Sequence, residues 1–346
     1  MTHDTRRGFG SDNHSGAHPR AIEAIAAANT GHVPAYGDDP WTERARTRVR
    51  ELLGPDCDVH FTLTGTGANV VALGTLCRAY EAVICPLTAH INIDECGAPE
   101  HVANVKLVPV ATPDGKLTPE LVRPHLTGFG FEHHAQPRAI SISQATEYGT
   151  VYSAGEVRAL ADLAHAHGMV LHMDGARVAN AAAYLGVPVR AFTADAGVDA
   201  LSFGGTKNGM AVGEALVLFG DARSDAVPYV RKQATQLASK MRFVTAQFDA
   251  MLDGGLWLEL AAHANAMAQR LAQKASAVPG VRVTQPVQAN EVFAVLPERA
   301  IPELQERFRF YLWDEAAHEV RWVCSWDTTE DDVDALAGEL ARLAAG

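Results

Sequence analysis

The sequence predicts an α/β fold: a mostly parallel central sheet with helices on both faces, and a smaller C-terminal α+β domain. Short apolar runs of β-type composition alternate with helical segments between about residues 55 and 220. Glycine-rich turns follow several of these runs, as is typical of strand-to-helix connections. Beyond residue 220, long helical stretches precede short strands. We therefore expect residues 1–254 to form the large domain, with an N-terminal arm at about 1–20, and 255–346 to form the small one.

Each element is predicted from apolar periodicity, helix caps and glycines. Ser153 and Glu156, for example, have the spacing of a capping box at the start of a helix. The large domain is predicted to contain strands at 57–63, 82–86, 138–143, 169–174, 198–205 and 213–220, a glycine-rich turn at 64–69, and helices at 70–80 and 153–168. The remaining predicted elements are helical stretches at 227–255 and 256–278, strands at 280–285, 291–297 and 320–326, and a closing helix at 330–345.

Composition narrows the classes of function. The 346 residues include 41 acidic and 29 basic side chains, a net charge of −12, which disfavours nucleic acid or an anionic membrane as the main partner. An anionic substrate must therefore be bound by a local cluster of cations. The five cysteines are odd in number and lack C-x-x-C spacing, which argues against a disulfide framework or a structural zinc site. No apolar stretch approaches eighteen residues, so we expect a soluble, cytoplasmic protein without a metal.

Three predicted strand ends carry residues suited to chemistry. The strand at 57–63 is followed by Gly65, Thr66 and Gly67, the strand at 169–174 ends at Asp174, and the strand at 198–205 is followed by Lys207. Ligands of open α/β sheets bind beyond the carboxyl ends of the strands. Taken singly, these features are equally typical of a tight turn, a helix cap and a solvated lysine.

Together the three strand ends favour pyridoxal 5′-phosphate (PLP) as cofactor. PLP needs a lysine amine for its aldehyde, a carboxylate to keep its pyridine nitrogen protonated, and a cradle for its phosphate. A nicotinamide cofactor fits less well, because Val70 replaces the third glycine of the dinucleotide-binding fingerprint and Lys207 would have no role.

The sequence also resembles a known family. SDNHSG, AYGDDP, TGTGAN, TAHINIDECGAPE, HMDGAR and FGGTKNGMAVGE occur in the order found in low-specificity L-threonine aldolases, PLP-dependent enzymes of fold type I, the transferase fold of aspartate aminotransferase. The resemblance extends from about residue 9 to VRWVCSWD near the C-terminus. It implies an α/β fold of that type, a homo-oligomer such as a tetramer built as a dimer of dimers, and a site at a subunit interface.

The resemblance implies a set of cofactor-binding residues. Lys207 resembles the Schiff-base lysine and Asp174 the partner of the pyridine nitrogen. The turn of Gly65, Thr66 and Gly67 resembles the phosphate site, and His90 the histidine that stacks on the pyridine ring. Arg177 is also expected beside the cofactor. Asp94 and Glu95 are expected behind the site or at the surface.

Other residues are implied at the substrate. Ser11, Arg177 and Arg321 match positions that bind the α-carboxylate. His133 resembles a second active-site histidine near the substrate hydroxyl, with His134 beside it as the alternative by one residue. Tyr36 matches a tyrosine at the mouth of the site that is contributed across a subunit interface.

The sequence departs from the family pattern in two places. SFGGTK stands where many relatives have a serine directly before the lysine. The run RKQATQLASKMRF replaces a glycine-rich basic stretch that contacts the phosphate. Four basic residues in this run are alternative phosphate contacts: Arg231, Lys232, Lys240 and Arg242.

The implied activity is that of a carbon–carbon lyase, an aldehyde-lyase of amino-acid metabolism. It would cleave L-threonine, L-allo-threonine or related β-hydroxy-α-amino acids such as phenylserine reversibly to glycine and an aldehyde. A base must take the β-hydroxyl proton, and His90, His133 and a phosphate-bound water are all candidates. The alternative is another fold type I enzyme, a β-eliminating lyase or an aminotransferase.

Overall fold

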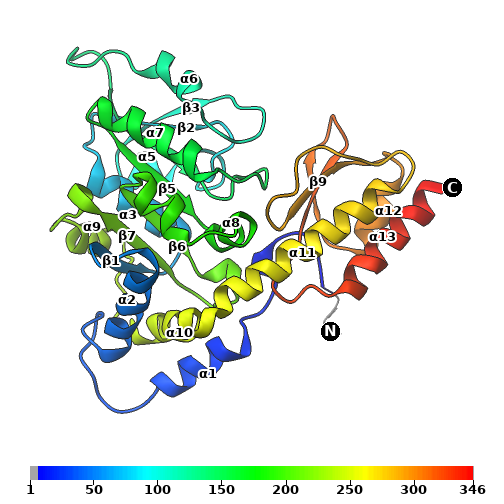
Figure 1. Ribbon diagram of the computed structural model, residues 1–346, viewed down its shortest axis with the longest axis horizontal. Coiled ribbons are helices and arrows are strands. Elements are labelled where there is room, and N and C mark those ends of the chain that lie inside the picture. The colour runs from blue at the N-terminus through cyan, green and yellow to red at the C-terminus, as the bar shows by residue number, and fades with distance from the viewer. Residues whose placement is uncertain (1–6, 346) are drawn as a thin grey trace.

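Two sheets organise the chain, whose computed structural model describes residues 7–345 (Figure 1). The first six residues of the predicted N-terminal arm lie outside the described part. The larger sheet consists of β1 (Cys57–Thr62), β2 (Glu81–Pro86), β3 (Lys106–Val110), β4 (Gln136–Ser143), β5 (Val170–Gly175), β6 (Ala200–Gly204) and β7 (Glu214–Phe219). The smaller sheet consists of β8 (Arg282–Val283), β9 (Glu291–Val295), β10 (Tyr311–Asp314) and β11 (Glu319–Val323).

The larger sheet is mostly parallel, as predicted. Its strand order is β1-β7-β6-β5-β4-β2-β3, and only β7 runs antiparallel to its neighbours. Parallel pairing brings the carboxyl ends of β2, β4, β5 and β6 to one edge. The smaller sheet is antiparallel, in the order β10-β11-β9-β8.

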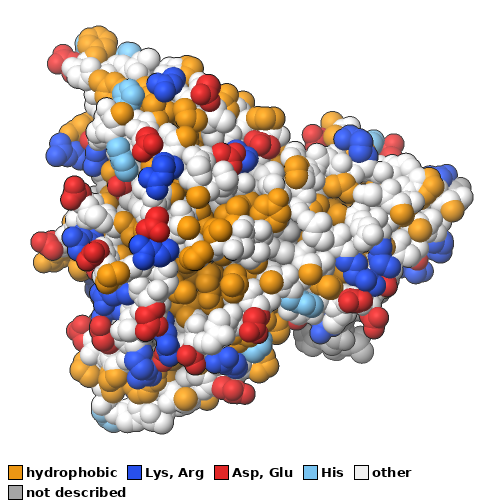
Figure 2. Space-filling view, viewed as in Figure 1, with side chains coloured by type: hydrophobic (Ala, Val, Ile, Leu, Met, Phe, Trp, Pro, Cys, Tyr) orange, Lys and Arg blue, Asp and Glu red, His pale blue; other side chains and the backbone are white. Residues whose placement is uncertain are grey.

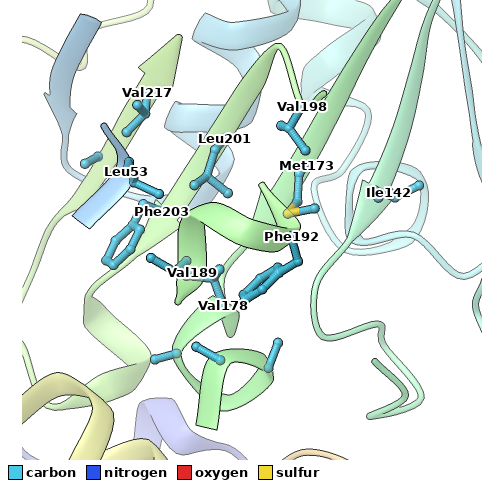
Figure 3. Packing of buried hydrophobic residues seen from close by; sticks show 14 of the residues in the cluster. Leu53, Ile142, Met173, Val178, Val189, Phe192, Val198, Leu201, Phe203 and Val217 are labelled. Carbon is cyan, nitrogen blue, oxygen red and sulfur yellow. The ribbon is translucent and has the colours of Figure 1, made fainter. Parts of the chain in front are cut away.

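Helices cover both faces of the larger sheet. Alternate residues of β6 show this arrangement, because Ala200 packs with α3 on one face while Leu201 and Phe203 pack with α7 and α8 on the other. Figure 3 shows Leu201, Phe203 and Phe192 within that second layer. The α-helices are α1 (Pro19–Ala28), α2 (Pro40–Leu53), α3 (Gly65–Leu76), α4 (His90–Ile93), α5 (Ala98–Val102), α6 (Pro119–Val122), α7 (Ala154–Ala166), α8 (Val178–Leu185), α9 (Val227–Gln233), α10 (Arg242–Leu252), α11 (Leu256–Ser276), α12 (Ala300–Arg307) and α13 (Glu330–Ala345).

Helix α11 connects the two hydrophobic cores. Near its N-terminus Trp257 and Leu260 belong to the core of the large domain, whereas Met267 and Leu271 belong to the core of the small one. Phe9, from the N-terminal arm, is buried in the second core as well. The domain division at residue 255 stays a prediction, since this helix begins there and contributes to both cores.

Several boundaries differ from those predicted. The helix expected at 70–80 begins at Gly65, inside the segment expected to be a turn. The helical stretch expected at 227–255 divides into α9 and α10, separated by a segment without regular structure. The sequence analysis did not predict strands β3 and β10 or helices α1, α2, α4, α5, α6, α8 and α12. None of the helices within residues 7–345 is both long enough and apolar enough to cross a membrane.

The ends of β5 and β6 approach each other unusually closely. A Cβ atom built on Gly204 would lie 2.4 Å from the carbonyl oxygen of Ala176, and one built on Gly175 would lie 2.8 Å from the carbonyl oxygen of Ser202. Both contacts are shorter than real Cβ atoms tolerate, and backbone cannot move as easily as a side chain. The two glycines therefore set the distance between the residues that follow these strands.

We predict that Gly204→Ala destabilises the protein by about 1–3 kcal/mol, because the added methyl group overpacks the junction of β5 and β6. Gly338→Ala is the matched control, since this exposed glycine lies in α13 with open space around its Cα atom. Alanine there should stabilise the helix by about 0.5–1 kcal/mol. Denaturant unfolding of the two variants measures both effects, and equal stability of Gly204→Ala and the unsubstituted protein would contradict the steric argument.

Candidate active site

A cavity of about 360 Å³ lies at the carboxyl ends of the parallel strands. Its wall is formed by the start of α3, by the residues after β2, β4, β5 and β6, and by β7. The predicted residues that line it are Gly65, Thr66, His90, Asp174, Arg177 and Lys207. Segments more than 140 positions apart in sequence thus face one cavity.

Lys207 lies in a single turn of 3-10 helix, Thr206–Asn208, directly after β6. Glu214 of β7 supports this turn, because its Oε2 accepts a hydrogen bond of 2.8 Å from the backbone N–H of Gly205. Burial raises the pKa of Glu214 to about 7, although hydrogen bonds from Thr206 and Gly205 oppose the shift. The glycines before Lys207 permit close contacts, because a Cβ on Gly204 would clash with the backbone of Ala176 and one on Gly205 with Met210 and the backbone of Gly213.

A hydrogen-bonded chain connects Asp174 to His90. Asn69 of α3 donates from its amide nitrogen to Asp174 Oδ2 at 2.7 Å and to Glu95 Oε1 at 2.8 Å. Glu95 Oε1 also lies 2.8 Å from His90 Nδ1. Because Glu95 accepts at this contact, the imidazole donates from Nδ1, and Nε2 is the nitrogen that can gain or lose a proton. Glu95 and Asn69 therefore fix the orientation of both predicted cofactor contacts.

Asp174 is charged despite its burial. Burial alone would raise its pKa, but the positive charge of His90, the hydrogen bond from Asn69 and the charge of Lys207 lower it below the ordinary value. The hydrogen bond to Glu95 raises the pKa of His90, against the effect of burial. The pair thus offers an anion and a readily protonated imidazole in the same wall.

One nitrogen of His90 and one oxygen each of Glu95 and Asp174 lie within 4.8 Å of one another, a spacing that a metal ion also accepts. The amide of Asn69 donates to both carboxylates between them. A group that donates a proton competes with a cation for the same oxygens, so the arrangement favours hydrogen bonding within the protein.

The predicted phosphate turn is the first turn of α3. The N–H groups of Gly65 and Thr66 have no acceptor within the helix and lie in the cavity wall. Gly67 differs, because its N–H is bonded to Thr64 Oγ1 and the side chain of Gln236 occupies the space where a Cβ would lie. An anion would therefore bind to the N–H groups of Gly65 and Thr66, at the positive, N-terminal end of the helix dipole.

The four alternative phosphate contacts in the basic run do not line the cavity. Arg231 is buried and donates to the carbonyl oxygen of Phe61 at 3.1 Å. Lys232 lies over the ring of Tyr36, and Arg242 donates to the carbonyl oxygen of Thr30. From this run it is Gln236 that reaches the turn, where its Oε1 accepts from the N–H of Leu63 at 3.1 Å.

Arg177 lies in the cavity wall, held by an acid from the N-terminal arm. Its Nε and Nη2 donate to the two carboxylate oxygens of Asp12 at 2.7 and 3.1 Å. Although burial opposes its charge, the carboxylates of Asp12 and Glu291 raise the pKa of Arg177. Bidentate pairing fixes the guanidinium plane and leaves Nη1 as the outward donor.

Arg321 of β11 faces the same acidic pair from the small domain. Its guanidinium lies 5.0 Å above the ring centre of Trp313, and its Nη1 lies 3.9 Å from Glu291 Oε1. Glu291 Oε1 is also 3.5 Å from Arg177 Nη1. The structure thus brings the two predicted carboxylate-binding arginines to the same oxygen of one glutamate.

Four predicted substrate residues do not line the cavity of this chain: Arg321, described above, and Ser11, Tyr36 and His133. Ser11 caps the single-turn helix Asp12–His14 by accepting from the N–H of Asn13, and Asn13 lines the cavity instead. Tyr36 is exposed, with a positive φ of 63°. His133 precedes β4 and lies in a hollow with the first residues of β2 and β3, at the end of the sheet opposite the cavity.

Sequence reasoning missed a second buried acid at the site, Glu147. Its Oε1 accepts from Ser143 Oγ at 2.6 Å and from the backbone N–H of His90 at 2.8 Å. Its Oε2 is buried and has no hydrogen-bond partner among residues 7–345. Burial raises the pKa of Glu147 to about 7. A glutamate four residues after a predicted strand, near the other strand-end groups, was the one available signal.

Comparisons with known proteins agree with this geometry. A family model described as beta-eliminating lyase matches residues 8–298. The chain is 46% identical to the low specificity L-threonine aldolase of Pseudomonas sp. (strain NCIMB 10558), over 98% of this chain and 99% of that one. It is 47% identical to the enzyme of the same name from Pseudomonas aeruginosa, over the full length of both.

The chain belongs to the low-specificity L-threonine aldolase family. A solved structure of threonine aldolase from Leishmania major superposes with a TM-score of 0.91 at 32% identity, covering 97% of this chain and 99% of that one. The predicted fold class, fold type I of the PLP-dependent transferases, is confirmed by this likeness together with the mostly parallel seven-stranded sheet.

In this member of the threonine aldolase family we predict that Glu147→Gln stabilises the fold at pH 8 but not at pH 4.5. An acid whose pKa rises on folding binds more protons in the folded state, so stability falls as pH rises from the unfolded pKa of 4.5 to about 7. Removing that charge should recover on the order of 2 kcal/mol at pH 8. Thermal unfolding across this pH range measures the effect. Glu298→Gln, whose side chain is exposed, is the control and should change stability at neither pH.

Proposed function

We propose that this chain is a PLP-dependent aldolase that cleaves L-threonine, L-allo-threonine and related L-β-hydroxy-α-amino acids, such as phenylserine, reversibly to glycine and an aldehyde. The observation that carries the proposal is the shared cavity of Lys207, Asp174 and Arg177 at the carboxyl ends of the parallel strands. A lysine, a buried carboxylate and an arginine are the groups that PLP and an amino acid need together.

The residues present fit the cofactor. Lys207 would bind its aldehyde, and the anionic Asp174 would pair with a protonated pyridine nitrogen. The N–H groups of Gly65 and Thr66 would bind its phosphate, with the ring of His90, held by Glu95, beside the pyridine. When bound, PLP accepts the electron pair that remains as the Cα–Cβ bond of the substrate breaks.

The chain's own residues would orient the substrate. Arg177 Nη1 and Arg321 Nη1 lie 3.5 and 3.9 Å from the same oxygen of Glu291, so a substrate carboxylate bound by both arginines would be fixed in angle as well as position. Orientation matters because only a Cα–Cβ bond held in line with the electron-accepting system of the cofactor is weakened.

A base must hold the proton of the β-hydroxyl group. His90 lies in the cavity wall, with Nε2 free because Nδ1 is bonded to Glu95. Glu147 also lies in this wall with one unpartnered oxygen. A phosphate-bound water remains an alternative. His133 would have to reach the cavity from another subunit, since it lies at the opposite end of the sheet in its own chain.

We also propose a cytoplasmic homo-oligomer, a tetramer with sites at subunit interfaces. Exposed Tyr36 at a strained backbone position and exposed Tyr184 and Leu258 support a partner surface. Figure 2 shows hydrophobic side chains gathered at the centre of one face, near α8 and α10. The five cysteines are all unpaired, which supports a reducing compartment.

Lys207→Ala is expected to abolish both the visible absorbance of the bound cofactor and the release of glycine from threonine, because no other lysine lines the cavity among the described residues. Lys274→Ala is the control and should retain both, because Lys274 pairs with Asp334 and does not line the cavity. Retention of the spectrum and of activity in Lys207→Ala would refute the proposed role of this lysine.

Arg321→Ala should weaken glycine binding about 10- to 100-fold while the cofactor stays bound, because it removes a charged contact to the carboxylate and none to the cofactor. Calorimetry of glycine binding and the visible spectrum report the two quantities separately. Arg282→Ala, an exposed strand arginine of the same domain, serves as control. Loss of cofactor from Arg321→Ala would contradict the prediction, because it would mean that Arg321 contributes to cofactor binding.

Products distinguish the aldolase from the two alternatives. An aldolase releases glycine and acetaldehyde from threonine without a second substrate. A β-eliminating lyase would release ammonia and a keto acid, and an aminotransferase would require a keto acid as amino acceptor. Glycine and acetaldehyde formed in equal amounts by the purified protein, with threonine as sole substrate, support the proposal. Either of the other product patterns refutes it.

A further inference from the structure

Glu291 is a buried acid close to two arginines. It lies on β9, its side chain is fully buried, and its Oε1 is 3.5 Å from Arg177 Nη1 and 3.9 Å from Arg321 Nη1. Neither of its carboxylate oxygens has a hydrogen-bond partner among residues 7–345. The nearby Nε of Arg321 is also buried and unpartnered. Buried charged groups normally satisfy their hydrogen-bonding capacity, so these atoms indicate a site made for a further polar group.

The second acid of the cluster is already satisfied. Asp12 accepts from Arg177 Nε and Nη2, and its Oδ2 accepts from the amide of Asn290 at 3.1 Å. Burial would raise its pKa, but the charges of Arg177 and Lys207 and these hydrogen bonds lower it. Asp12 therefore stays charged and remains hydrogen-bonded to two of the three side-chain nitrogens of Arg177.

The charges of the cluster are balanced before any substrate arrives. The charged groups that face Glu291 are Arg177 at the start of α8, Arg321 on β11, Asp12 in the N-terminal arm and Lys207 after β6. The two arginines oppose the two acids nearest to them. A substrate carboxylate between the arginines would bring a third anion into a buried place, which is costly unless another group is neutralised.

We propose that Glu291 shares Arg177 and Arg321 with the α-carboxylate of the amino acid and takes up a proton as that carboxylate binds. The inference rests on the proposed function, because it requires an amino-acid carboxylate at these arginines. Glu291 acts through the arginines as a positioning residue. In the free enzyme its negative charge balances the charge of the two arginines. When the substrate binds, Glu291 is protonated and the arginines pair with the substrate carboxylate instead.

Glu291, rather than Asp12, is the acid that is neutralised. Burial raises the pKa of Glu291, against the attraction of Arg177 and Arg321, whereas the pKa of Asp12 is lowered. No hydrogen bond among the described residues holds the anionic form of Glu291. A second anion near it makes protonation more favourable still.

A proton taken up on binding makes the affinity depend on pH. Below the pKa of Glu291 in the free enzyme, the carboxyl is already neutral and binding takes up no proton through it. Above that pKa, the affinity for a carboxylate falls by up to about tenfold per pH unit, until pH passes the higher pKa of the complex. The other groups that titrate on amino-acid binding are common to all variants, so a comparison of variants isolates Glu291.

The test is calorimetry of glycine binding to the cofactor-loaded enzyme between pH 6 and 9, in buffers of different ionisation enthalpy that report the number of protons taken up. Glu291→Gln keeps the shape of the side chain and removes its charge. Relative to the unsubstituted enzyme, we expect it to take up fewer protons, by up to one per site, and to bind glycine about tenfold more tightly at high pH. Glu298→Gln, the exposed control, should match the unsubstituted enzyme.

Glycinamide, which has the amine but no carboxylate, is the second probe, and its binding should show the same proton uptake with and without Glu291. If Glu291→Gln does not retain cofactor, Glu291→Leu supplies the same comparison without a polar group. Equal proton uptake and equal pH dependence for glycine in the variant and the unsubstituted enzyme overturn the inference but leave the amino-acid site intact. Failure of the cofactor-loaded, unsubstituted enzyme to bind glycine refutes the proposed function itself.

Discussion

The site depends on a buried carboxylate that stays charged. Asp174 has almost no contact with solvent, and burial alone would neutralise it. Asn69, the N–H of Ala176 and the charges of His90 and Lys207 keep it anionic. Asn69 is itself held by Glu95, which also orients His90. Asp174 and these three residues are linked by hydrogen bonds, so a change in any one of the four alters the charge or the orientation of the others. The site therefore requires α3, β5 and the segment after β2 to be correctly placed at the same time.

Hydrogen bonds and neighbouring charges divide four buried acids of the site into two groups. Asp12 and Asp174 accept from charged or amide donors, and their pKa values are lowered despite burial. Glu147 and Glu291 each have an oxygen without a partner among the described residues, and burial raises their pKa values. Similar carboxyl groups close to one another thus include some that favour the anion and some whose protonated form is favoured by burial. Acid and base chemistry at one pH requires this kind of separation.

In the proposed function, the part of the site formed by one chain would face the cofactor and the substrate carboxylate. Lys207, Asp174 and the start of α3 are close to one another because parallel strands end at the same edge of the sheet. Tyr36 and His133 lie away from the cavity of their own chain. Their exposure suits residues that a neighbouring subunit receives, and the residues around the β-hydroxyl group would then depend on assembly.

The sequence by itself determined the fold class and the strand ends at which Asp174 and Lys207 lie, because alternation, glycine turns and the order of strands and helices are written in consecutive residues. The roles predicted for Arg177 and His90 came instead from the resemblance to a family. Only the tertiary structure decided which acids surround them. The sequence analysis did not select Glu147 and Glu291, because a glutamate near a strand is usually exposed to solvent and only distant segments bury these two. Burial and the arrangement of partners from other elements set the protonation of these acids, and neither is encoded in local sequence.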